Sequence, residues 1–402
     1  MLKHVKAELE DPILKVMASF KASPAKNKHD LGIGVYRDSS GATPIFKAVK
    51  EAELILQKNE KSKAYLGPIG DVEFNRLLRQ MLFSGTPLLD SDSIQSIQTP
   101  GGTGALRIAG ELLNRAIPGA KLWLSDPAWS THKPIFTGAG LTTATYRYFD
   151  AHSKQLDFTR LCDDLNSIPE GDVVLLQSCG HNPSGCNLTK EQWYQVSQLM
   201  AERKLLPLLD LAYHGWDQGL DGDLVSLTAI ESCHDEWMLC YSASKTFSLY
   251  NDRTGALIVR SVNADVSIQV LNLTLNLVCA NYYMPPAHGA SVVRTILSSA
   301  ELTDMWQQEL DAARSRVEEC RQRFIQALQA KGSEAYDFLK GQRGLFVYLG
   351  LDEKQLDWLR QEHALYFGPG GRLNIAGLNR QNLPQICDAL LDLEQIDARS
   401  LK

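Results

Sequence analysis

The chain lacks the features that mark membrane, secreted and nucleic-acid-binding proteins. No stretch approaches the roughly 18 apolar residues that span a bilayer, and the N-terminal segment MLKHVKAELEDPILKVMASF has no signal-peptide core. The eight cysteines form no CxxC pair, which favours reduced thiols over disulfides. No basic cluster interrupts a net charge of −6, so we expect no nucleic-acid partner. These absences predict a cytoplasmic protein that acts on small molecules and has no membrane partner.

What the chain does contain is the pattern of an α/β protein. Its 402 residues are 44% hydrophobic and 22% charged, enough for about two to three domains around sizeable cores. Between short apolar runs lie helical segments such as 188–204. Such alternation predicts a mostly parallel central sheet flanked by helices on both faces. The runs expected to be strands are 121–126, 172–179, 205–213, 236–242 and 255–260.

The C-terminal part has a different pattern of hydrophobic residues. Hydrophobic residues recur every three or four positions from Trp306 to Leu328, which predicts a long helix, and Gly332 is placed to end it. Strand-like segments at 344–350 and 372–377 follow, so we expect a smaller α+β domain. The boundaries we predict are an N-terminal arm (1–12), a small-domain part (13–44), a large α/β domain (45–310) and a small C-terminal domain (311–402).

Four chemically versatile residues mark the predicted strand ends: Asp210 and Lys245 each end a strand, and Tyr213 and Asn182 follow shortly after one. Each has an ordinary explanation when taken alone, as a turn former, a capping acid, a core phenol or an exposed amine. Together they share one edge, because the carboxyl ends of parallel strands form the ligand-binding edge of such a sheet.

This set of residues suits pyridoxal 5'-phosphate. A lysine forms the Schiff base, an acid holds the ring nitrogen protonated, and Tyr213 and Asn182 could contact the phenolate oxygen of the ring. The phosphate needs N–H groups, hydroxyls and a cation. TPGGTGAL (99–106) would supply the N–H groups at a helix start, and Ser242, Ser244 and Arg253 the rest.

In these motifs the chain resembles the class I (fold-type I) aminotransferases of the aspartate/aromatic amino acid subgroup. The resemblance runs over nearly the whole length. It implies transamination between an L-amino acid and a 2-oxo acid such as 2-oxoglutarate, and a homodimer with shared active sites. It is carried by DPIL, LGIGVYRD, AYLGPIGDVEF, TPGGTGALRIA, DPAWSTHKPIF, HNPSG, DLAYHGW, SASKTFSLYNDRTGA, PPAHGASVV and GRLNIAGL.

The resemblance also implies a role for individual residues. Lys245, Asp210 and Tyr213 would be catalytic, with Lys245 shuttling the proton between the substrate α-carbon and C4′. His132 would support Asp210, and Arg372 would clamp the substrate carboxylate. The cofactor would be held by Gly102, Thr103, Trp129, Asn182, Asp210, Tyr213, Ser242, Lys245 and Arg253, with Tyr65 from the neighbouring subunit. The substrate would meet Arg372, Gly34, Trp129, Asn182, Phe346 and Cys279.

One departure bears on the substrate. Relatives that bind dicarboxylates carry an arginine shortly before PPAHGA, where this chain has Cys279 and no arginine from 261 to 293. A thiol cannot neutralise a buried carboxylate. The sequence therefore favours an aromatic or broadly hydrophobic amino acid aminotransferase, with aspartate aminotransferase as the alternative. Arg343 is a candidate for holding a dicarboxylate co-substrate, and Gln177 stands where relatives often have histidine.

Other interpretations are weaker. GGTGALRIAG could be a dinucleotide-binding loop of an oxidoreductase, but the third glycine and the ribose-binding acid are missing. A cofactor-binding regulator on the same fold would need a basic DNA-binding appendage. The spacing of Cys179, His181 and Cys186 matches no common zinc site. We therefore expect no metal, and a structural role for His181.

Overall fold

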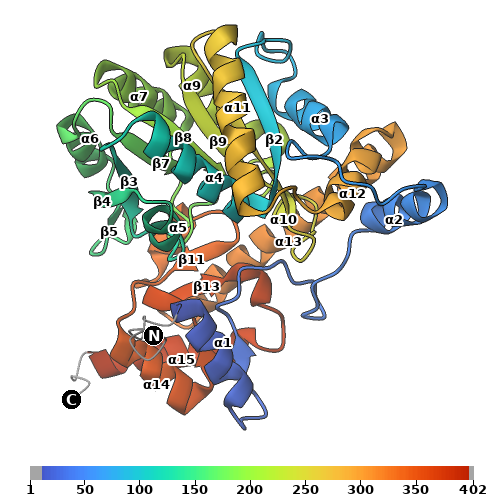
Figure 1. Ribbon diagram of the computed structural model, residues 1–402. Coiled ribbons are helices and arrows are strands. Elements are labelled where there is room, and N and C mark those ends of the chain that lie inside the picture. Colours follow the sequence, from blue (N-terminus) through green and yellow to red (C-terminus); the bar gives the residue numbers. More distant parts are fainter. Residues whose placement is uncertain (1–10, 398–402) are drawn as a thin grey trace, which may run out of the picture.

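A computed structural model describes residues 11–397, so the predicted N-terminal arm lies almost wholly outside the described residues. Its centre is a seven-stranded sheet (Figure 1). In spatial order the strands are β2 (Ile94–Pro100), β10 (Thr254–Arg260), β9 (Trp237–Ser242), β8 (Leu206–Leu211), β7 (Val173–Gln177), β3 (Lys121–Asp126) and β4 (Thr142–Arg147). All five predicted strands are therefore confirmed.

Helices cover both faces of this sheet because successive side chains of each buried strand point to opposite faces and pack into two separate cores. In β7, for example, Val173 and Leu175 join one core and Val174 and Leu176 the other. The first core packs under α4 (Gly101–Ala116), α5 (His132–Gly138) and α11 (Ala264–Asn281). The second packs under α2 (Lys47–Asn59), α3 (Val72–Phe83), α6 (Phe158–Ser167), α7 (Lys190–Glu202), α9 (Val225–Cys233) and α12 (Ala287–Leu297).

Strand β10 differs from the expected parallel arrangement. It runs antiparallel to both β9 and β2, because only the short helix α10 (Ala243–Thr246) and a turn separate it from β9. A crossover helix is what a parallel neighbour would require. Two further strands, β2 and β4, escaped the sequence analysis because their residues, IQSIQTP and TTATYR, are rich in polar side chains.

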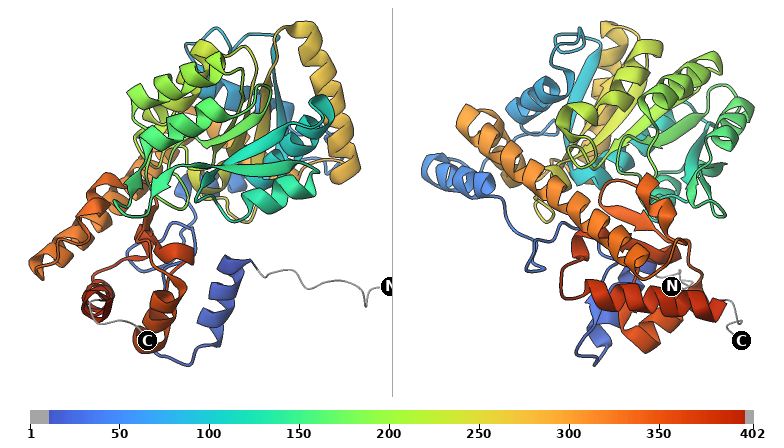
Figure 2. Two further views of the ribbon diagram at one scale, coloured as in Figure 1. Left: turned by 90° about the vertical axis from the view of Figure 1, so that its left-hand side faces the viewer. Right: turned by 180° about the vertical axis from the view of Figure 1, so that it is seen from behind.

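The long predicted helix is α13 (Ala300–Ala330), which runs from α2 and α12 at one end to the C-terminal part at the other (Figure 2). Gly332 follows it with a positive φ of 85°. The remaining elements of this part are η2 (Asp337–Gly341), β11 (Phe346–Tyr348), α14 (Glu353–His363), β12 (Leu365–Tyr366), η3 (Pro369–Gly371), β13 (Arg372–Asn374), η4 (Ile375–Gly377) and α15 (Leu383–Asp397).

The N-terminal residues join this C-terminal part. Strand β1 (His29–Asp30) pairs in parallel with β12, and Phe20 of α1 (Pro12–Ala22) packs its ring edge-on against Tyr366. Short elements α8 (Gly219–Gly222), β5 (Phe149–Asp150) and β6 (Gln155–Leu156) complete the chain. The exact domain boundaries remain a prediction. Among the described helices, none has the length and hydropathy needed to cross a membrane.

Candidate active site

A cavity of about 230 Å³ lies at the carboxyl ends of β7, β8 and β9, where the sheet meets β11 and β13. Two segments of the N-terminal region also reach it. Most of the residues singled out from the sequence line this one cavity, although they are spread over some 340 positions of the chain. The lining residues are Ile13, Ile33, Gly34, Gly102, Thr103, Leu106, Trp129, Gln177, Asn182, Asp210, Ala212, Tyr213, Ser242, Ser244, Lys245, Arg253, Phe346 and Arg372.

Lys245 lies within α10, three residues beyond the end of β9, and not at the strand end that the sequence suggested. Its ammonium group stands 4.9 Å from the centre of the Tyr213 ring. Burial, opposed by Asp210 and assisted by Arg253 and Arg372, lowers the pKa of Lys245 to about 8. A substantial fraction of this lysine is therefore a neutral nucleophile near physiological pH.

Asp210 stands in β8 beside Gln177 of β7 and is nearly buried. Its Oδ2 atom pairs with Nε2 of His132 at 2.9 Å, and His132 is fully buried at the start of α5. Trp129 packs edge-on against the His132 ring, with centroids 5.1 Å apart. The carboxyl group is thus fixed in orientation by an imidazole while it faces the cavity.

The N-terminus of α4 forms an anion cradle together with α10. Gly101 has a φ of 69°, and a Cβ there would lie 2.6 Å from Nη2 of Arg253, so only glycine allows this approach. Arg253 donates from Nη1 to Ser244 Oγ at 3.2 Å, and the Ser242 side chain lies directly beside Gly102. Helix N–H groups, hydroxyls and a guanidinium here converge as a phosphate group requires.

Arg372 begins β13 and is 4% exposed. It donates from Nη1 to Asn182 Oδ1 at 2.8 Å and from Nη2 to the carbonyl of Gly32 at 2.7 Å, and its guanidinium lies 4.5 Å from the Phe346 ring centre. Its Nε has no hydrogen-bond partner among residues 11–397. Phe346 in turn fills the space beside Gly34, where a Cβ would lie 2.7 Å from the ring. A clamped guanidinium of this kind suits a carboxylate ligand.

His181 makes a structural link between two serine side chains. Its Nε2 lies 3.0 Å from Ser125 Oγ and its Nδ1 2.8 Å from Ser184 Oγ, and burial lowers its pKa to about 3. Since Ser125 Oγ already donates to the carbonyl of Pro127, it accepts from Nε2–H. A pKa this low leaves the ring neutral, and both of its nitrogens lie within hydrogen-bond distance of a serine hydroxyl. Within residues 11–397, no cluster of three or more ligand-type residues is placed to hold a metal ion.

Two predicted site residues lie away from this cavity. Tyr65 is 82% exposed and packs its ring edge against Tyr283, with centroids 5.8 Å apart. Cys279 is exposed on α11. Neither lines the cavity formed by its own chain, so their assignments to the site stay predictions that require a second copy.

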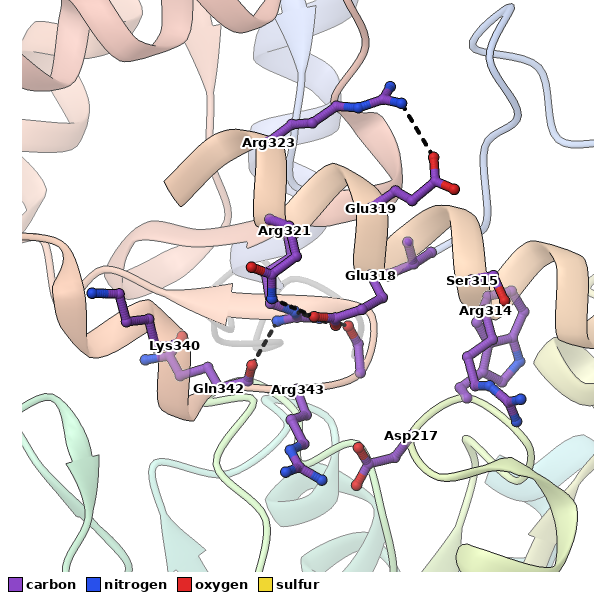
Figure 3. Close-up of a pocket in the computed structure, with 14 residues that line it drawn as sticks. Asp217, Arg314, Ser315, Glu318, Glu319, Arg321, Arg323, Lys340, Gln342 and Arg343 are labelled. Carbon is purple, nitrogen blue, oxygen red and sulfur yellow. Dashed lines mark hydrogen bonds and ion pairs between the residues drawn. The ribbon is translucent and has the colours of Figure 1, made fainter. Parts of the chain in front are cut away.

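Arg343 was a candidate for holding a dicarboxylate, but it lies in a different hollow. Figure 3 shows it beside Asp217, in a groove of about 720 Å³ between α13 and the loop after β8. Most charges of this groove form ion pairs, as in the contacts Arg321–Glu318 and Arg323–Glu319. The larger volume therefore does not mark the site of chemistry, and Arg343 does not reach the substrate cavity of its own chain.

The apolar wall of the cavity was not predicted from the sequence. Ile13 of α1, Ile33, Leu106 of α4 and Ala212 line it, and they lie within or beside motifs that carry the resemblance. Apolar side chains carry no chemical signal that separates a ligand wall from an ordinary core. Only the folded arrangement identifies them.

Comparisons with known proteins agree with this geometry. The family model described as aminotransferase class I and II matches residues 26–390. Aspartate aminotransferase of Escherichia coli (strain K12) is 41% identical over 393 residues, 97% of this chain and 99% of that protein. Aromatic-amino-acid aminotransferase of Pseudomonas aeruginosa is 42% identical over 386 residues, 94% and 96% of the two chains. A solved aromatic-amino-acid aminotransferase from Burkholderia pseudomallei, covalently bound to pyridoxal phosphate, superposes with a TM-score of 0.94 at 33% identity, covering 98% and 99%.

Proposed function

This chain belongs to the class I and II aminotransferases, and we propose that it transfers amino groups from aromatic amino acids with pyridoxal 5'-phosphate as cofactor. One observation carries the proposal. A partly buried lysine with a pKa near 8, a carboxyl group, an anion cradle and a clamped arginine line a single cavity. The acceptor we propose is a 2-oxo acid such as 2-oxoglutarate.

The cavity fits the cofactor in charge and in shape. The glycines of α4 allow Arg253 and Ser242 to lie against the helix N-terminus, where they would hold the phosphate group, while Asp210 would face the ring nitrogen and Trp129 the ring. Asn182, Tyr213 and Thr103 would complete the contacts. When bound, pyridoxal phosphate supplies an aldehyde carbon for covalent attachment and a protonated ring that withdraws electrons from the substrate.

The protein's own residues would then bind the substrate and move its proton. Arg372 holds the α-carboxylate, and its contacts to Asn182 and Gly32 fix the direction in which it does so. Lys245 would move the proton between the substrate α-carbon and C4′, the aldehyde carbon of the cofactor. Its pKa near 8 is close to the working pH, as general base catalysis favours.

The preference for an aromatic donor rests on the apolar wall and on Cys279. Ile13, Ile33, Leu106 and Phe346 offer no partner for a second carboxylate, whereas a phenyl side chain gains about 1.5–3 kcal/mol on burial. Aspartate remains the second candidate donor because the Escherichia coli relative is an aspartate aminotransferase.

We further propose a homodimer in which Tyr65 and Cys279 reach the partner's cavity. Large apolar side chains gather on the surface that carries Tyr65: Val72 is 66% exposed and Tyr283 59%. Tyr283 lies two residues before PPAHGA. Val72, Met284 and Pro285 line the same hollow as Tyr65. Exposed apolar patches of this kind commonly mark interfaces between subunits.

A donor panel tests the substrate assignment. With 2-oxoglutarate as acceptor, we expect kcat/KM for phenylalanine or tyrosine to exceed that for aspartate. Cys279→Arg should raise kcat/KM for aspartate about tenfold or more, because a charge-assisted hydrogen bond contributes about 1.5–3 kcal/mol.

The matched control is Cys233→Arg, at another exposed cysteine on a helix far from the cavity, which should leave the panel unchanged. A wild-type preference for aspartate of about tenfold or more would overturn the assignment.

A further inference from the structure

Gln177 ends β7 at the cavity, directly beside Asp210 of the neighbouring strand, and is 9% exposed. None of the roles proposed above uses it. A buried, uncharged amide placed among Asp210, Lys245 and Arg372 calls for an explanation, because burying such a polar group is costly unless it is hydrogen-bonded.

Both polar atoms of the amide bond to one other residue. Oε1 of Gln177 accepts from the backbone N–H of Asn182 at 2.9 Å, and Nε2 donates to the carbonyl of Asn182 at 3.0 Å. These two bonds close a ring across the loop that leads from β7 to Asn182. They fix both backbone groups of Asn182, the residue that precedes Pro183.

Asn182 passes this constraint on to the substrate clamp. Its Oδ1 accepts from Nη1 of Arg372 at 2.8 Å, and its side chain is also hydrogen-bonded to Tyr213. A shift of the Asn182 backbone would therefore displace the contact that orients the Arg372 guanidinium.

We propose that Gln177 is a positioning residue for carboxylate binding, acting through Asn182 on Arg372; the inference rests on the proposed function. Only a side chain with a donor and an acceptor side by side can satisfy the N–H and C=O of one residue together. An amide meets this requirement at every pH. An imidazole carries its two nitrogens in divergent directions, and a carboxylate lacks the donor unless it is protonated.

The test uses the holoenzyme and 3-phenylpropionate, an unreactive carboxylate probe whose dissociation constant is measured by calorimetry. Gln177→Met, which keeps the volume but removes both hydrogen bonds, should raise this constant and the KM for phenylalanine by about tenfold or more. The kcat should change by less than the KM, because Lys245 and Asp210 are retained. A thermal melt records whether the variant is folded.

A matched control separates positioning from general destabilisation. Gln98 is buried as well and also bridges backbone groups, accepting from Asp71 N–H at 2.8 Å and donating to the Pro286 carbonyl at 2.8 Å. It lies in β2, with three strands between it and β7. Gln98→Met should lower the melting temperature without weakening binding of the probe.

Gln177→Glu gives a second readout that needs no comparison of stability. A protonated carboxyl can replace both hydrogen bonds, whereas a carboxylate repels the Asn182 carbonyl. The probe should therefore bind this variant progressively worse than wild type as pH rises through the titration of the new carboxyl. Asp210, His132, Lys245 and Arg372 face the same region in both proteins, so the pH dependence of wild type is the reference for the variant.

The outcomes are distinguishable. If Gln177→Met binds the probe within twofold of wild type, or if Gln177→Glu follows the wild-type pH dependence, the positioning role is wrong while transamination stands. If wild type itself binds no probe and transfers no amino group, the proposed function fails and this inference fails with it.

Discussion

Replacing Lys245 by methionine is expected to lower kcat/KM for every amino donor by at least about 10⁴-fold, since the side chain is both the attachment point and the base in our proposal. The geometry leaves no obvious substitute. Of the lysines in the described chain, Lys245 is the one that lines the cavity. The measurement is steady-state transamination with phenylalanine and 2-oxoglutarate, and residual activity above about 1% of wild type would contradict the role.

The same variant should be more stable than wild type when both are free of cofactor. The unfolded lysine has a pKa of 10.5, whereas burial lowers the folded value to about 8. Below pH 8 the full cost of burying the charge, about 3 kcal/mol, is present. It declines as pH rises from 8 to 10.5 and is absent above that range. The stability gain from Lys245→Met should therefore be largest below pH 8 and shrink as pH rises. This result would also show that lost activity does not reflect misfolding.

Replacing Arg372 by lysine is expected to lower kcat/KM for phenylalanine by about 10²–10³-fold, because truncating one partner of a buried charge pair costs about 2–5 kcal/mol. Lysine presents a point charge where the structure holds a planar group with two donors already in use, on Asn182 and Gly32. The readout that isolates the clamp is 2-phenylethylamine, which lacks the carboxylate. Its slow turnover should be nearly the same in variant and wild type.

The control for this variant is Arg343→Lys. Arg343 is exposed in the separate groove of Figure 3, so its replacement should leave both substrates unaffected. Equal losses for phenylalanine and 2-phenylethylamine in Arg372→Lys would instead indicate damage to the cavity as a whole, and would contradict the assignment of the clamp.

Much of the fold was predictable because buried parallel strands consist of consecutive apolar residues. Val173 to Gln177 and Leu206 to Leu211 are almost entirely hydrophobic, and both are strands. Strand β2 escaped notice because its buried Gln98 is satisfied by Asp71 and Pro286, which are distant in sequence. The direction of β10 depends on the length of a connection, which hydrophobicity does not report.

Part of the candidate site was predictable because the residue types themselves are unusual at strand ends, as with Asp210 and Asn182. The position of Lys245 was misplaced by three residues, since the run of small polar residues around it reads equally well as strand or turn. The role of Gln177 needed coordinates, because it depends on two contacts to one backbone five residues away. The assignment of Cys279 to the site requires a second copy of the chain, so neither the sequence nor one chain's structure tests it.

The most direct test of the central proposal is to map the cofactor on the purified protein. The cofactor-loaded protein should have a visible absorption band that borohydride bleaches. The reduction should leave a stable phosphopyridoxyl group, which peptide mass spectrometry should locate on Lys245. A stable adduct on another lysine, or a protein that takes up no pyridoxal phosphate at all, would contradict the account.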